Sequence, residues 1–476
     1  MQRQGRQRKN SRGRNPRQGD RRRGATVATA LGTVLLTVSV SALSTPTAVA
    51  QGDSDTHGQA GRVEIEDVDP FYDTSGVADA LPGAAPGDVL RTAGASYTPH
   101  LAGLDPRMVA SAPSTVQKIM YNTVNQWGEN TPVTGYVVEP TTPWRGAGER
   151  PTVVIGRGTV GQGDQCAPSR NWPLDNQPDP LASGRTVALE GLYDLIWASQ
   201  GVRVVVTDYV GMGTPGLHTY MNRLDQAHAV LDAARATRTL VEEDGGTFGK
   251  VGFYGHSQGG GAAAAAAEEM SSYAPDLDIS GAYASAPPAE LGAVQRNIDG
   301  SDLVGAIGYT INGLVERYPD LAPLLDEHLS EQGRGTLDAI AGQCTDEITE
   351  AYDGQTTAEW TGDGRPLDQL LGEMPTAWAA MADQHIGAPG RPLPDAPVMI
   401  VSGRYDQNVE YHQAKKLARD WSAAGVPVTY RDDVMPPLES YNHFIQAVTG
   451  GPFGISFLRD RFNGVAHGQG ITDRGN

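Results

Sequence analysis

From about residue 117 onward, short apolar runs alternate with longer amphipathic stretches. The runs PTVVI, VRVVV and VGFY, at residues 151–155, 202–206 and 251–254, are nearly continuous in apolar residues, as strands buried on both faces must be. The stretch from Arg223 to Glu243 between the last two has the length and pattern of a helix. Strands that alternate with helices predict an α/β fold with a mostly parallel central sheet flanked by helices.

A long segment interrupts this alternation. It spans residues 291–395, between the sixth expected strand, ISGAYASAPPAE, and the seventh, APVMIVSG, and is far longer than an ordinary connection. Apolar residues recur in it at helical spacing: Leu303, Ile307, Ile311, Leu314, Leu337, Ile340, Leu367, Leu370 and Leu371. We expect a large helical cap whose apolar residues mostly form its own core, above an apolar pocket at the carboxyl edge of the sheet.

The first 50 residues differ in charge from the rest. An arginine-rich segment ends at Arg21-Arg22-Arg23. An uncharged stretch from Gly24 to Leu43 follows it, and then the small residues Ala48-Val49-Ala50. This order is typical of a secretory signal peptide, 1–50, cleaved near Ala50. Arg22-Arg23 also hints at the twin-arginine route, although the residues after it fit that route poorly. A permanent membrane anchor is the alternative, which the Thr, Ser and Gly interruptions disfavour. The sequence predicts a secreted, extracellular protein.

The rest of the chain is strongly acidic, and the whole carries a net charge of −19. Nucleic acid is excluded as a partner because phosphates require a basic surface, and no obligate protein partner is indicated. We expect a flexible leader at 51–68, the core at 69–290 and 396–463 on either side of the cap, and a flexible tail at 464–476.

The chain has two cysteines, Cys166 and Cys344. In an exported protein thiols oxidise, and two cysteines allow one pairing. We therefore expect a disulfide bond, with two unpaired buried thiols as the alternative.

One motif carries chemistry. Gly255-His256-Ser257-Gln258-Gly259 fits G-x-S-x-G and lies directly after a buried strand and before a helix-forming alanine run, where a nucleophilic serine sits on a sharp turn. Larger side chains at 255 and 259 would collide across that turn. Ser257 is the expected nucleophile, and the start of the following helix suits a developing oxyanion.

A nucleophilic serine needs a base and an orienting acid, which in this fold class follow in the order Ser, Asp or Glu, His. Asp406 ends the strand-and-loop segment VMIVSGRYD, and His443 precedes a short expected helix after the last strand. Both therefore fall on the sheet edge that bears Ser257. The rival bases are His256, His412 and His467; the rival acids are Asp432, Asp433 and Glu439.

The oxyanion hole needs two N–H donors. Gln258, directly after the serine, is the expected first donor, and the second should come from the glycine-rich loop GRGTVGQGDQCAPS, within Thr159, Val160 and Gly161. The residues leave the choice among these three open, and a flexible turn is the alternative.

The chain resembles the secretory lipases of the alpha/beta-hydrolase superfamily, the lipase A-like family, in its actinobacterial branch. The resemblance runs from about Asp69 to Phe457 and rests on GTVGQGDQCAPS, DYVGMGTPGLHTY, GHSQGG, SAPPAELGAV, GRYDQNV and NHF. It implies that Ser257, Asp406 and His443 are the family triad, that Asp208 and Tyr209 belong to a loop near the pocket, and that the substrates are hydrophobic carboxylic esters, including acylglycerols.

We therefore expect a serine hydrolase acting through an acyl-enzyme on small-molecule or lipid esters, with transient contact at a lipid interface and no cofactor or metal. A short-chain carboxylesterase or a peptidase of the same fold is the alternative within enzymes. A catalytically inactive hydrolase fold used for surface binding is the alternative outside them.

Overall fold

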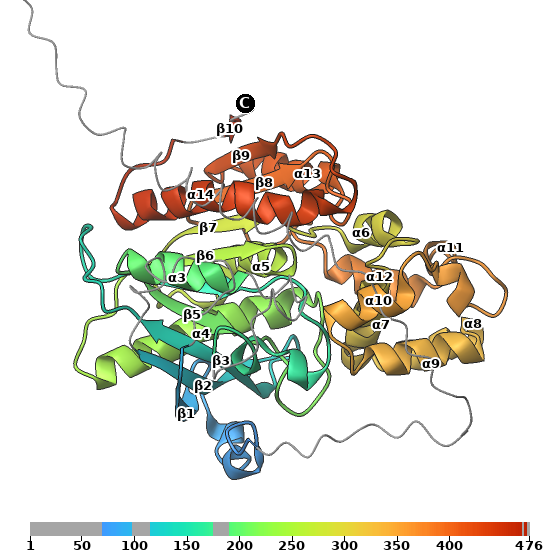
Figure 1. The fold of residues 1–476 in the computed structure, drawn as a ribbon, viewed down its shortest axis with the longest axis horizontal. Helices are drawn as coiled ribbons and strands as arrows, with labels where there is room; N and C mark the ends of the chain where they lie inside the picture. Colours follow the sequence, from blue (N-terminus) through green and yellow to red (C-terminus); the bar gives the residue numbers. More distant parts are fainter. Residues whose placement is uncertain (1–68, 98–114, 175–189, 469–470, 474–476) are drawn as a thin grey trace, which may run out of the picture. The chain divides into compact units, whose positions relative to one another are not determined.

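A ten-stranded sheet forms the centre of the computed structural model, in the order β1-β2-β3-β5-β4-β6-β7-β8-β9-β10 (Figure 1). The structure describes residues 69–97, 115–174, 190–468 and 471–473. The predicted signal peptide and leader lie outside these ranges. In the described ranges, no helix has the length and hydropathy needed to span a membrane.

The first three strands are antiparallel to their neighbours, and all others are parallel. The strands are β1 (Val89–Ala95), β2 (Thr115–Val124), β3 (Asn130–Glu139), β4 (Thr152–Gly156), β5 (Arg203–Thr207), β6 (Val251–His256), β7 (Ile279–Ser285), β8 (Val398–Gly403), β9 (Val428–Asp433) and β10 (Ile471–Asp473). In β4, β5, β6 and β8 every residue is buried, which explains their continuous apolar sequences. The expected mostly parallel sheet is therefore confirmed.

Helices cover both faces of the sheet and pack into two separate hydrophobic clusters. One cluster includes residues of α4 (Arg223–Glu243), α5 (Gln258–Tyr273) and α13 (Tyr411–Ala423). The other includes residues of α3 (Leu192–Ser199) and α14 (Asn442–Phe462). The six alanines from Ala262 to Ala267 are all buried in α5, so the repetitive composition serves close packing of this helix on the sheet.

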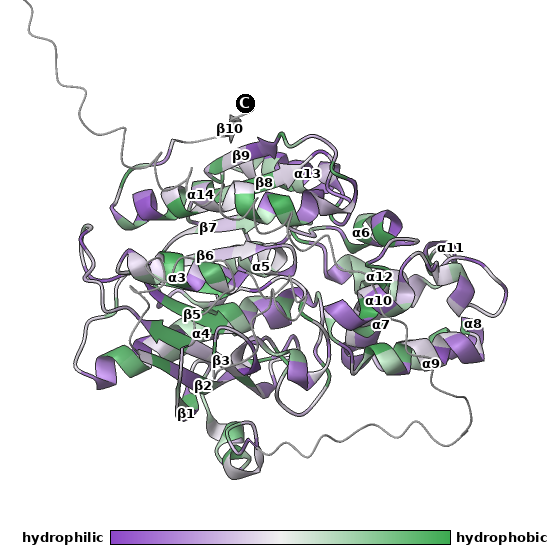
Figure 2. Cartoon of the chain, viewed as in Figure 1, coloured by the Kyte–Doolittle hydropathy of each residue, from purple (hydrophilic) through white to green (hydrophobic). Residues whose placement is uncertain are grey.

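The long insertion is a helical cap, as the sequence predicts. Because β1 adds a strand that the sequence pattern does not reveal, the cap follows the seventh strand of the structure and precedes β8. Its helices are α6 (Leu291–Ile298), α7 (Gly305–Arg317), α8 (Leu321–His328), α9 (Glu331–Ile340), α10 (Thr345–Tyr352), α11 (Leu367–Leu371) and α12 (Pro375–Asp383). They share a hydrophobic core of their own around Trp360 and Ile340, and Figure 2 shows both polar and apolar residues on them, typical of helices that bury one side.

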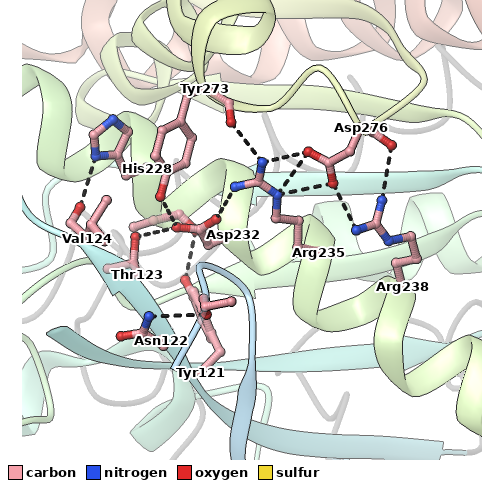
Figure 3. A network of polar contacts seen from close by, with 12 residues as sticks. Tyr121, Asn122, Thr123, Val124, His228, Asp232, Arg235, Arg238, Tyr273 and Asp276 are labelled. Carbon is pink, nitrogen blue, oxygen red and sulfur yellow. Dashed lines mark hydrogen bonds and ion pairs between the residues drawn. The ribbon is translucent and has the colours of Figure 1, made fainter. Parts of the chain in front are cut away.

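A buried polar network joins α4 to the end of β2 and to α5 (Figure 3). The carboxylate of Asp232 accepts hydrogen bonds from Thr123 Oγ1 and Tyr273 OH, each at 2.7 Å, and from Arg235 Nη1 at 2.8 Å. His228 stacks on Tyr273 with 3.9 Å between ring centroids. Loss of water raises the pKa of Asp232 to about 6 despite these donors, and the network fixes the helix that precedes β6.

The structure differs from the sequence predictions at the C-terminus. His443 is the second residue of a helix of 21 residues, α14, rather than preceding a short one, although Pro452 lies inside it. Three residues of the predicted tail form β10, which pairs in parallel with β9, and His467 Nε2 lies 2.7 Å from Thr429 Oγ1.

Candidate active site

Ser257 occupies the turn between β6 and α5. Its backbone has φ 58° and ψ −125°, a region that a residue with a side chain rarely adopts. A Cβ on Gly255 would lie 2.1 Å from the Gly259 carbonyl oxygen, and a Cβ on Gly259 would lie 2.0 Å from the Gly156 carbonyl oxygen. Both motif glycines are thus required by close backbone approach, as the sequence predicts.

His443 and Asp406 meet Ser257 at the carboxyl edge of the sheet. His443, in the first turn of α14, places Nε2 at 2.9 Å from Ser257 Oγ. Asp406 follows β8 and places its two carboxylate oxygens at 2.9 and 2.8 Å from Nδ1 of His443. The three side chains, which lie far apart in sequence, are all buried.

The hydrogen-bond partners of Asp406 determine how the imidazole is protonated. A carboxylate can only accept, so Nδ1 of His443 carries the hydrogen and Nε2 presents its lone pair to the serine hydroxyl. The backbone N–H groups of Asn408 and Val409 each donate to Asp406 Oδ1 at 2.9 Å. These two bonds hold the carboxylate in the orientation that His443 requires.

The rival residues have other partners. His256 places Nδ1 at 3.0 Å from Ser285 Oγ and lies beside the ring of His443, with 4.5 Å between centroids. Burial and the neighbouring His443 hold the pKa of His256 well below its usual range. It therefore packs as a neutral ring behind the candidate base.

Asp432 and Asp433 are held by neighbouring side chains. Asp432 accepts from Tyr411 OH at 2.6 Å and from Arg404 Nη2 at 3.3 Å, and these hydrogen bonds lower its pKa. Asp433 accepts from Thr449 Oγ1 at 2.8 Å. The structure brings Asp406, rather than either of these carboxylates, to His443.

The glycine-rich loop after β4 lies between the nucleophile turn and the cap. A Cβ on Gly259 would be 3.0 Å from the carbonyl oxygen of Arg157, so the loop passes directly against the start of α5. Thr159 and Val160 direct their carbonyl oxygens to Thr345 of the cap, at 2.9 and 3.0 Å. Gln258, as the first residue of α5, has no acceptor within the helix for its N–H.

The loop is also bonded covalently to the cap. Cys166 and Cys344 form a disulfide bond across 178 residues, which confirms the predicted pairing. Cys344 immediately precedes α10, and Gly161 forms an isolated bridge with it. The candidate oxyanion loop and one cap helix therefore hold each other in place.

An apolar cavity lies among the cap helices. Five residues of the predicted apolar set line it, whereas Leu337 and Ile340 belong to the cap core alone. The five are Ile307, Ile311, Leu314, Leu367 and Leu371. Tyr220 also lines the cavity, and its hydroxyl lies 2.7 Å from Thr159 Oγ1. One end of the cavity thus adjoins the candidate oxyanion loop.

Several residues of the site carry no local signal in the sequence. Gln446 donates from Nε2 to Ser285 Oγ at 3.2 Å, beneath His256, and Glu190 accepts from the N–H of Gly158 at 2.6 Å. Tyr220 falls within the motif GLHTY, which marks the segment but not its contact with Thr159. Among the described residues, no three His, Cys, Asp or Glu side chains are grouped so as to hold a metal ion.

The sheet with its nucleophile turn has the architecture of an α/β hydrolase. Candida antarctica lipase A in its closed state has this fold with a TM-score of 0.70 at 20% identity, over 84% of this chain and 87% of that chain. The rice cell wall degrading esterase LipA of Xanthomonas oryzae matches with a TM-score of 0.64 at 18% identity, over 79% of this chain and 100% of that chain.

Residues 182–470 match the family model of the secretory lipases, and the chain belongs to that family. A Mycobacterium tuberculosis protein named as a probable inactive lipase is 28% identical over 83% of this chain and 82% of its own length. A secreted triacylglycerol lipase of Malassezia furfur is 26% identical over 87% of this chain and 79% of its own length. The chain is thus a lipase-like hydrolase in family and in fold.

Proposed function

We propose that the protein is a secreted serine hydrolase that cleaves hydrophobic carboxylic esters through an acyl-enzyme on Ser257. The contact of Ser257 Oγ with His443 Nε2 at 2.9 Å, backed by Asp406, carries this proposal. His443 takes the hydroxyl proton while Oγ attacks the ester carbonyl carbon. The proton then passes to the leaving alkoxide oxygen, and the alcohol departs.

The second half of the cycle uses the same groups. His443 removes a proton from water, the hydroxide attacks the acyl carbon, and Ser257 leaves with the proton returned by His443. Asp406 stabilises the imidazolium in both halves. The N–H of Gln258 and one N–H within Thr159, Val160 and Gly161 would stabilise the oxyanion.

The cap cavity supports a hydrophobic acyl group as substrate. Its lining is almost wholly apolar, and it adjoins Thr159 through Tyr220. An acyl chain bound there would extend away from Ser257 into the cap, with each buried methylene adding up to about 0.8 kcal/mol of binding. Triacylglycerol hydrolysis by the Malassezia furfur relative agrees with such a substrate.

A catalytically inactive, surface-binding role is the second candidate, because one relative is named as inactive. Labelling with a fluorophosphonate probe and hydrolysis of p-nitrophenyl esters separate the two. The wild type should be labelled once and should hydrolyse esters, and Ser257→Ala should lose both activities while melting normally. Ser199→Ala, at an exposed serine of α3, is the control that should keep both. An unlabelled, inactive wild type would refute the enzymatic proposal.

A further inference from the structure

One peptide unit of the loop after β4 is held at both ends. Its carbonyl oxygen, on Arg157, accepts a hydrogen bond from Tyr209 OH at 2.8 Å. Its N–H, on Gly158, donates to Glu190 Oε2 at 2.6 Å. Tyr209 follows β5 and Glu190 precedes α3, so two separate elements fix the orientation of this single peptide plane.

That orientation bears on the candidate oxyanion hole. The clamped peptide follows Gly156, whose carbonyl group lies against Gly259. It directly precedes Thr159, the first of the three residues that could donate the second N–H to the oxyanion. Because successive peptide planes share a Cα atom, rotation of the Arg157–Gly158 peptide would redirect the N–H of Thr159. The side chain of Arg157 cannot fix this plane by itself, since it points to Asp194 and Tyr136, at 2.7 and 2.6 Å.

The surroundings of Glu190 favour a strong hydrogen bond. It is only partly exposed, and its Oε2 lies 2.6 Å from the backbone nitrogen of Gly158, a short distance for a hydrogen bond from a backbone N–H. The charged or titratable groups around it are Arg157, Asp194, His443, Tyr193, Tyr209 and Tyr254. Loss of water raises the pKa of Glu190 to about 7, against the attraction of Arg157 and the N–H of Gly158.

We propose that Glu190 is a positioning residue, whose carboxyl oxygen sets the oxyanion loop by holding the N–H of Gly158. This inference rests on the proposed ester hydrolysis and adds a residue to it. The role depends on where the acceptor atom lies, and therefore on the length of the side chain more than on its charge.

Three variants of the full-length protein test this role. Glu190→Gln keeps an oxygen acceptor at the same position and loses the charge, whereas Glu190→Asp keeps the charge and withdraws the acceptor by one methylene. Glu190→Ala removes both. We expect kcat on a p-nitrophenyl ester to fall about 10- to 100-fold in Glu190→Ala and Glu190→Asp, with KM changed less than about threefold, because a misplaced oxyanion donor affects the transition state. Glu190→Gln should keep kcat within about threefold of the wild type.

Glu268 supplies the matched control. It is another glutamate whose pKa burial raises to about 7, and it accepts from the N–H of Gly387 at 2.5 Å, where the cap ends. Glu268→Gln and Glu268→Ala should leave kcat per folded molecule within about twofold of the wild type.

Three results would overturn the role of Glu190: an unchanged kcat in Glu190→Asp, a Glu190→Gln variant as slow as Glu190→Ala, or an equal fall in the Glu268 variants. If Glu190→Ala does not fold, the kcat of Glu190→Asp compared with that of Glu190→Gln still tests whether the position of the acceptor atom matters. A wild type that hydrolyses no ester would instead refute the proposed function.

Discussion

Asp406 holds both of its carboxylate oxygens within 2.9 Å of Nδ1 of His443, on the side of the imidazole opposite Ser257. An acid in this position selects the tautomer that can deprotonate the serine. The contact between Asp406 and His443 also connects the end of β8 to α14. Both of these elements follow the cap in sequence, whereas Ser257 precedes it.

Asp406→Asn should therefore lower kcat by about four orders of magnitude, because the amide can donate to Nδ1 and favour the wrong tautomer. Asp432→Asn is the matched control, since Asp432 is bonded to Tyr411 and Arg404 instead, and it should change kcat less than tenfold. Steady-state rates on a single ester measure both. A larger loss in Asp432→Asn would transfer the role of the acid to the loop after β9.

Gly259→Ala should abolish activity and destabilise the fold. The added Cβ would lie 2.0 Å from the carbonyl oxygen of Gly156, so the turn and the loop after β4 must separate. Gly335→Ala in α9 is the control: a Cβ there meets nothing within 4 Å, and alanine should stabilise the helix by about 0.5–1 kcal/mol. Thermal melting and ester hydrolysis test both variants, and an active Gly259→Ala would contradict the close approach.

The disulfide Cys166–Cys344 should contribute a large share of stability. It joins two residues separated by 178 positions, for which the loop-closure model gives about 5 kcal/mol, although engineered bonds often give less. Reduction, or serine at both positions, should lower the melting temperature and the rate of ester hydrolysis, since the bond ties the candidate oxyanion loop to α10. Two free thiols in the denatured, unreduced protein would refute the bond.

The sequence predicts the turn after β6 and places Ser257, Asp406 and His443 on one sheet edge, because buried parallel strands have continuous apolar runs and their carboxyl ends share one edge. It does not predict β1, whose residues are only partly buried and alternate irregularly, as suits an edge strand. A strand that packs on one face alone keeps polar residues on its other face, so it lacks the continuous apolar run by which the buried strands are predicted.

Tertiary contacts explain the other differences. Gly451, Pro452 and Gly454 indicate a break in α14, yet the helix continues because the missing side chains let it approach the sheet and α3: a Cβ on Gly454 would lie 2.5 Å from the ring of Tyr283, and one on Gly451 would lie 2.1 Å from Tyr193 OH. Glu190 has no periodic signal, since its role depends on a contact with Gly158 that forms only in the fold.

The contribution of Glu268 to the stability of the protein should fall as the pH rises from about 4.5 to 7. Burial raises the pKa of Glu268 from 4.5 to about 7 despite Arg223, whose Nη1 lies 3.2 Å from Oε2. Between these values the folded protein binds a proton that the unfolded chain has released, so the free energy of unfolding decreases with pH.

Glu268→Gln should remove this part of the pH dependence, which amounts to at most about 3–4 kcal/mol at about 1.4 kcal/mol per pKa unit. Denaturant unfolding at pH 5 and pH 8, for wild type and variant, measures the difference. Glu190 and Asp232, whose pKa values are raised to about 7 and about 6, contribute with the same sign and remain in the variant. An identical pH dependence in Glu268→Gln would show that this carboxyl titrates normally.

The cap cavity should determine which acyl chains the protein cleaves. If a chain enters past Tyr220, each added methylene contributes up to about 0.8 kcal/mol, or roughly fourfold in kcat/KM, until the cavity is full. Efficiency on p-nitrophenyl esters should therefore rise from acetate to longer chains. A maximum at acetate would exclude lipase specificity and leave a short-chain serine esterase.

Ala377→Phe should shift that maximum to shorter chains. Ala377 lines the cavity from α12 and is 6% exposed, so a phenyl ring would occupy part of the volume while acetate still fits. Trp378→Phe is the control, because the adjacent side chain is 53% exposed and does not line the cavity. Ile311→Asp should likewise depress long esters more than short ones, since a carboxylate in an apolar cavity opposes the acyl chain. An equal loss on every ester would assign both positions to the stability of the cap and not to the binding of substrate.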